Sequence, residues 1–149
     1  MKGMLKMREF LSKEATVKDE FEEGLHANVI IKDVQRYEAT PGINAQNETY
    51  INQAHYDVYL ENDTCKEVIK ISASDKATHE EKFVAFLLGI KKQKNIPIIN
   101  ANELANYIID NQIPFKIVKI PFETVDYTGK LVTRYSFRTS AKLIASLED

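Results

Sequence analysis

The basic and aromatic side chains near the end of the chain have the spacing that a strand would need to bind a polyanion. The stretch GKLVTRYSFR, residues 129–138, places Arg134 and Arg138 four residues apart, so one face of a β-strand would carry both. The preceding turn, VDYTG, holds Tyr127, a ring that no turn needs for packing. Cations that follow phosphates and rings on which bases stack are what single-strand nucleic-acid binding requires. The segment therefore predicts noncovalent binding by a hairpin.

Other cations and tyrosines lie in segments with strand patterns or in a long polar loop. The alternative for each tyrosine is a core or rim position that uses the hydroxyl as a polar handle, and for each lysine it is simple solvation of a strand. Tyr135 shares a strand face with Leu131 and Phe137, so we expect it in the core. The candidate binding residues are Lys32, Arg36, Tyr37, Tyr50, Tyr59, Lys70, Lys119, Tyr127, Arg134 and Arg138.

Signatures of catalysis are missing from the sequence. His26, His55 and His79 fall on different predicted elements, with no carboxylate at metal-ligand spacing. Acid pairs such as Asp57 with Glu61 occur at a turn, and helix acids normally face water. The sequence has neither a phosphate-binding glycine loop of the Walker type nor a G-x-S-x-G elbow. We therefore expect no enzyme activity, no metal and no cofactor.

Composition places the chain among ordinary globular proteins. Its 149 residues suit one main domain, with 44% hydrophobic and 28% charged residues and a net charge of -2. No apolar run reaches the roughly 18 to 20 residues of a membrane helix, and the amino terminus does not resemble a secretory signal. Cys65 is the single cysteine and cannot form an internal disulfide. These features predict a cytoplasmic protein that does not bind membranes.

The first half of the chain has mainly strand periodicity. Residues 1–23 are expected to form an N-terminal arm or short helix, and residues 24–149 the folded domain. Residues 25–39 predict a strand of about 12 to 14 residues, too long to lie flat, which suits a curved barrel strand. Residues 40–53 are rich in Asn, Gly and Thr and predict a long, mobile loop. Residues 54–62 and 66–74 alternate as the two strands of a hairpin.

The period then changes from two to 3.6 residues and back again. Residues 77–93 predict a helix with a Thr78–Glu81 capping box. Residues 100–112 predict a second helix, which Asn100 caps and in which Leu104, Tyr107 and Ile108 face inward. Two β runs, residues 114–125 and 131–140, close the chain. The order of three strands, helices and two strands predicts a mainly β, α+β fold: a five-stranded barrel like the oligonucleotide/oligosaccharide-binding (OB) fold, with its helical insertion between strands three and four.

The chain resembles the single-stranded DNA-binding proteins of bacteriophage replication and recombination cassettes. The likeness spans roughly residues 21–140, through FEEGLHANVIIKDVQRYEAT, the loop with Gly42, HYDVYLE, FLLGI, PFKIVKI and the closing strand after an aromatic-containing turn. The loop between the first two strands is longer than usual in the family, and the tail, SLED, is less acidic. The resemblance implies an OB-like barrel that coats single-stranded DNA in the bacterial host, forms homo-oligomers and works beside a recombinase or replication protein.

A second hypothesis uses the same barrel for a different partner. OB barrels also bind proteins, because a fold does not fix a function. The acidic stretch at residues 19–23 would then belong to a protein-binding adaptor or inhibitor. Affinity for an oligonucleotide at low salt distinguishes the two hypotheses, since phosphate contacts strengthen as salt falls.

Overall fold

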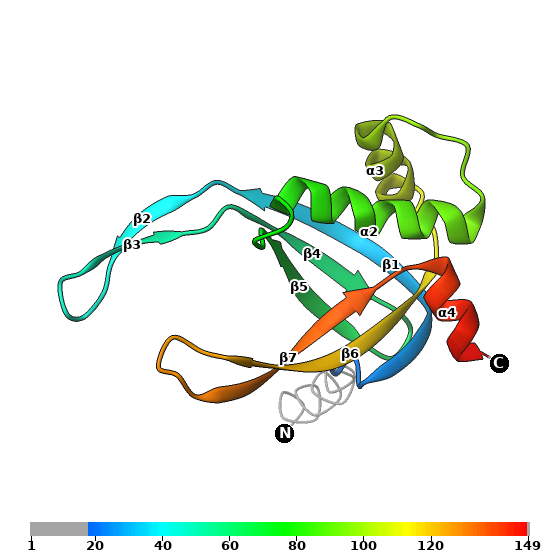
Figure 1. Cartoon of the computed structure of the whole chain (residues 1–149). Coiled ribbons are helices and arrows are strands. Elements are labelled where there is room, and N and C mark those ends of the chain that lie inside the picture. The colour runs from blue at the N-terminus through cyan, green and yellow to red at the C-terminus, as the bar shows by residue number, and fades with distance from the viewer. Residues whose placement is uncertain (1–17, 149) are drawn as a thin grey trace, which may run out of the picture.

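The computed structural model describes residues 18–148 and consists of one curled antiparallel sheet with three helices (Figure 1). The five strands of the main sheet lie in the order β5-β4-β1-β6-β7, and β2 and β3 form a separate two-stranded hairpin. The sheet curls into a half-barrel in which β5 and β7 are the two edges. The strands are β1 (Gly24–Tyr37), β2 (Thr40–Ile43), β3 (Thr49–Asn52), β4 (His55–Glu61), β5 (Lys66–Ser72), β6 (Phe115–Val125) and β7 (Leu131–Arg138).

The long first strand is shared by the two halves of the sheet, as its length predicts. The first part of β1 pairs with β6 and the later part pairs with β4, both antiparallel. Irregularities between His26 and Val29 and between Ile31 and Asp33 allow the strand to bend, because a bulge adds local twist. Val29 and Ile31, in the middle of the strand, are fully buried. The bend therefore wraps both halves of the sheet around one core.

Two helices join β5 to β6, at the place in the chain that the change of period predicts. The capping box of Thr78 and Glu81 starts α2 (His79–Lys94), and the Asn100 side chain accepts from Glu103 N at the start of α3 (Ala101–Asp110). Both predicted caps are confirmed. Along α2, Phe83, Phe86, Leu87 and Ile90 are buried against the sheet, where Val58, Leu60 and Ile69 complete the core.

Two local predictions are wrong, and one helix was not predicted. Residues 40–53 contain β2 and β3, which pair from Thr40 with Asn52 to Ile43 with Thr49, so the segment is a projecting hairpin. Its backbone groups bond across the hairpin even though its side chains supply no core. The C-terminal residues form a further helix, α4 (Ala141–Glu148), which buries Ile144. Tyr107 of α3, expected to face inward, is 41% exposed.

The two hairpins project on the same side of the molecule. In Figure 1 the β2–β3 hairpin and the turn between β6 and β7 both point to the left, away from α3 and α4. In the β2–β3 hairpin, Gly42 lets the ring of its cross-strand partner Tyr50 pack directly on the backbone, because that ring occupies the space where a Cβ would lie. We call the β2–β3 hairpin and the projecting end of the β6–β7 hairpin the two arms; the curled main sheet lies between them.

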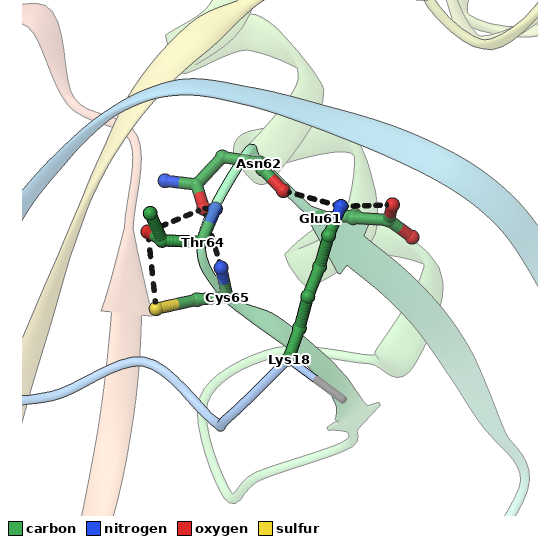
Figure 2. Close-up of polar contacts among 5 residues, drawn as sticks. All are labelled: Lys18, Glu61, Asn62, Thr64 and Cys65. Atoms are coloured by element: carbon green, nitrogen blue, oxygen red, sulfur yellow. Dashed lines mark hydrogen bonds and ion pairs between the residues drawn. The ribbon is translucent and has the colours of Figure 1, made fainter. Parts of the chain in front are cut away.

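The residues before β1 lie along the free edge of β5. Lys66 N donates to Asp19 O, and the Lys18 ammonium donates to Glu61 Oε2 at 2.6 Å and to Asn62 O at 2.8 Å (Figure 2). The Asn62 side chain in turn accepts from Thr64 N and Cys65 N, which fixes the turn between β4 and β5. Most of the predicted N-terminal arm, residues 1–17, lies outside the described part.

The Lys18–Glu61 pair gives a pH-dependent contribution to stability. The hydrogen bond from Lys18 lowers the pKa of Glu61 from its ordinary 4.5, with smaller help from the charges of Lys18, Lys32 and Lys66 against the opposing effect of burial. A carboxyl whose folded-state pKa is lowered stabilises the fold above its unfolded pKa, and loses that contribution as the pH falls through the folded value.

We expect Glu61→Gln to lower the free energy of unfolding at neutral pH by less than about 1 kcal/mol, because the pair is partly exposed and screened. The difference from the parent should vanish once the pH is below the lowered folded-state pKa of Glu61, where the carboxyl is protonated in both the folded and the unfolded protein. Urea unfolding at several pH values measures it. Glu123→Gln, on an exposed position of β6, is the control; a difference that persists in acid would contradict the assignment.

Candidate nucleic-acid interface

The outer face of the β6–β7 hairpin carries the two predicted arginines. Regular pairing along the hairpin puts Arg134 opposite Phe122 and Arg138 opposite Val118, on the face turned away from Lys119 and the interior. Both arginines are exposed, and Phe122 is 45% exposed beside Arg134. The Arg138 Nε donates to Ser136 Oγ at 2.8 Å, which steadies its guanidinium. The predicted shared face is confirmed, and an exposed ring accompanies it.

The turn at the tip of this hairpin displays Tyr127. The tyrosine is fully exposed, whereas its neighbours are tied by hydrogen bonds. Asp126 accepts from the Thr128 hydroxyl, from Lys130 N and from Thr128 N, and these bonds lower the pKa of its carboxyl. Gly129 supplies the positive φ of +84° that the turn needs. A hydrogen-bonded turn thus displays a fully exposed aromatic ring.

Three other predicted residues share the outer face of the opposite half of the sheet. Tyr37 is on β1, Tyr59 on β4 and Lys70 on β5, and the register places their side chains on the face turned away from α2. Acidic groups accompany them: Asp33 lies opposite Tyr59, and Asp57 lies opposite Lys70. Burial, then the charges of Tyr37, Asp57 and Asp33, raise the pKa of Tyr59. This face offers rings and hydrogen-bond acceptors but little net positive charge.

Tyr50 lies apart from these residues, on the β2–β3 hairpin. Its ring covers Gly42 on the paired strand and is still 45% exposed. The same hairpin exposes Ile43 and Ile51, at 66% and 65%. The second arm is therefore an exposed aromatic and aliphatic surface.

Lys119, predicted as a surface cation, is instead buried in the interior. It is 8% exposed, and its ammonium donates to Phe21 O at 2.7 Å and to Glu67 Oε1 at 3.0 Å. It also lies over the ring of Tyr135, 4.7 Å from the centroid. The alternation of residues along β6 did not predict this burial, because the start of the strand is enclosed on both faces. Ile117 and Lys119 on one face and Val118 on the other are all buried.

Lys32 and Arg36 also lie away from the other candidates. Lys32 is the exposed residue at the irregularity between Ile31 and Asp33. Arg36 pairs with Tyr56 on the helix side of the sheet, and its guanidinium contacts Glu38 and Glu80 of α2, each at 3.2 Å. The charge of Arg36 is thus balanced by two carboxylates.

Sequence reasoning missed two rings that the structure adds to the candidate surfaces. His55 stacks on Tyr37, with 4.9 Å between ring centroids and 17° between planes, and Phe122 is exposed beside Arg134. His55 lies directly opposite Tyr37 because of the register between β1 and β4. A single sequence does not determine that register, so it could not predict the pair. Leu131 and Tyr135, expected to face inward, are 60% and 45% exposed because the hairpin extends beyond the core.

Within residues 18–148 there is no group of three or more His, Cys, Asp or Glu side chains placed to hold a metal ion. In the same part of the chain, no helix has both the length and the apolar character needed to cross a membrane. No protein-family model matches the chain, and no curated protein sequence matches it.

Proposed function

We propose that the protein binds single-stranded DNA without catalysis and largely without regard to sequence, in phage DNA replication or recombination. The observation that carries the proposal is the sheet order β5-β4-β1-β6-β7 with helices between β5 and β6. Numbered by the five main strands this is 3-2-1-4-5, which is consistent with an OB-like barrel left open between its third and fifth strands. In OB folds the loops after strands one and four flank the ligand.

Those two loops correspond here to the two projecting arms. The β2–β3 hairpin follows the first main strand, and the turn with Tyr127 follows the fourth. Each arm exposes a tyrosine, and the second also carries Arg134 and Arg138. A strand that lies between the arms would stack bases on the rings and place phosphates on the arginines. Self-association would extend such a track, and a recombinase or replication protein is the partner class we propose.

The arginine pair gives this proposal a quantitative test. Arg134 and Arg138 are four positions apart on β7, which corresponds to about 13 Å, the length of about two nucleotides of extended backbone. We expect Arg134→Ala/Arg138→Ala to reduce the slope of log K against log salt by about 1.4, because each lost contact to a single-stranded phosphate removes about 0.7. Titrating fluorescent oligo-dT at several salt concentrations, beside a sizing run, measures slope and assembly together.

Lys92→Ala/Lys94→Ala is the matched control, since it removes two exposed cations from the end of α2. Its slope should equal that of the parent. Equal slopes for the arginine variant and the parent would remove β6–β7 from the interface. If the parent itself shows no affinity for oligo-dT at low salt, single-strand binding is refuted.

A protein-binding adaptor or inhibitor is the second candidate. The exposed aliphatic side chains of both arms favour it: Ile43 and Ile51 on one, Val125 and Leu131 on the other, all at least 60% exposed. Exposed aliphatic side chains contribute nothing to phosphate binding, whereas they are buried when two proteins associate. Under this hypothesis the parent would not bind oligo-dT at any salt concentration.

A further inference from the structure

The outer face of the β6–β7 hairpin is divided lengthwise into an apolar row and a basic row. Its residues pair across the hairpin as Val118 with Arg138, Ile120 with Ser136, Phe122 with Arg134 and Thr124 with Val132. The row on β6 is therefore mainly apolar, whereas the row on β7 carries both arginines. The two rows lie about 4.8 Å apart, which is the spacing of neighbouring strands.

The charge of this face is not balanced by acids. None of its eight residues is Asp or Glu, and neither Arg134 nor Arg138 forms an ion pair with another residue in the part of the chain that the structure describes. On the outer face of β1, β4 and β5, by contrast, Asp33 and Asp57 accompany the rings. The two arginines can therefore attract phosphates without first giving up a carboxylate partner.

Phe122 is the exposed ring of the apolar row. It is 45% exposed and lies directly opposite Arg134, and the Cβ atoms of two such residues are about 5 Å apart. A ring held on a paired strand is already in place for a base, and every base has a face that can stack on it. One nucleotide can therefore place its base on Phe122 and its phosphate on Arg134.

We propose that a single strand runs lengthwise along this face, with its phosphates on the β7 row and its bases turned onto the β6 row. One base stacks on Phe122, its phosphate contacts Arg134, and a phosphate about two nucleotides further along contacts Arg138. The inference rests on the proposed single-strand binding and adds to it a stacking residue and the path of the strand along one arm. A duplex does not fit this path, because its bases already stack on one another.

The test uses a fluorophore placed at the stacking position. The chain has no tryptophan, so Phe122→Trp introduces a single indole. We expect oligo-dT of about 15 nucleotides to quench the emission of this variant, because a base that stacks on an indole quenches it. The quenching should follow the same curve as binding of fluorescent oligo-dT, and a duplex of equal length should leave the emission unchanged.

Tyr107→Trp is the matched control, because it places the indole on α3, at the end of the molecule away from both arms. Its emission should stay constant when oligo-dT binds. Phe122→Ala should bind oligo-dT about tenfold more weakly than the parent, with an unchanged salt slope. Phe122→Leu should be equally weak, since leucine keeps an apolar side chain but offers no ring.

A Phe122→Trp protein that binds fluorescent oligo-dT without being quenched would overturn the inference while leaving single-strand binding intact. Parental affinity in Phe122→Leu would overturn it too, because Phe122 would then serve only packing, as would equal quenching by the duplex. A parent that does not bind oligo-dT would instead refute the proposed function, and this path with it.

Discussion

Lys119→Met should lower the free energy of unfolding by about 3 to 5 kcal/mol, the usual cost of removing one partner of a buried ion pair. The variant leaves the Glu67 carboxylate, whose side chain is 12% exposed, without its cation. It also removes the donor to Phe21 O, while Phe21 N still depends on Glu67 Oε1 at 3.2 Å. One ammonium therefore joins β6, β5 and the segment before β1. Urea unfolding measures the loss.

Lys116→Met is the control, because Lys116 pairs with Glu148 at the surface and should cost less than about 1 kcal/mol. Lys119→Met/Glu67→Leu should regain part of the loss, since it removes both charges but leaves the Phe21 amide unpaired. A Lys119→Met protein as stable as the parent, with a lower salt slope for oligo-dT, would return Lys119 to the DNA surface.

The Lys119 network has a place in the architecture. Its ammonium contacts Glu67 on β5, the ring of Tyr135 on β7 and Phe21 O beside β5. β5 and β7 are the two edges of the half-barrel, which a closed barrel would pair as its third and fifth strands. Side chains therefore span the opening that no backbone ladder joins in residues 18–148. The predicted surface position of Lys119 did not anticipate these contacts across the opening.

Local signals in the sequence predicted most of the fold correctly. The capping box at Thr78 and the cap at Asn100 each depend on residues three positions apart, and both helices begin there. The 14-residue β1 and the hairpin of β4 and β5 follow from alternation over short spans. These features depend on near neighbours, so one sequence contains them.

The errors occur where distant segments decide the outcome. Lys119 is buried because Glu67 and Phe21, far away in sequence, supply its partners. Residues 40–53 form a hairpin through backbone pairing, which composition does not report. Leu131 and Tyr135 share a strand face as expected, but they lie beyond the core and are exposed. Periodicity predicts which residues share a face and does not predict whether another element covers that face.

The candidate site was less predictable than the fold for the same reason. Arg134 and Arg138 share a face, as spacing alone requires. The grouping of Tyr37 with His55 and Lys70 depends on the register of three strands, and a shift of one residue would have turned them to opposite faces. Residue types thus indicated the chemistry, and register determined which residues act together.

Tyr127→Ala should weaken oligo-dT binding by about 1 to 3 kcal/mol at every salt concentration and leave the salt slope unchanged. Stacking a base on a ring releases no counterions, so the loss differs in kind from that of the arginine variant. The expected size depends on the turn: Asp126 fixes the loop, and Tyr127 is fully exposed at its tip. Tyr127→Phe should bind like the parent, since the ring remains.

Tyr107→Ala is the matched control, a partly exposed tyrosine on α3 at the end of the molecule away from both arms. Its affinity should equal that of the parent. If Tyr127→Ala binds as tightly as Tyr107→Ala while both stay folded, the tip of the hairpin does not stack on bases. An exposed ring with no ligand would then favour a protein partner, because the same tip carries Val125 and Leu131 beside it.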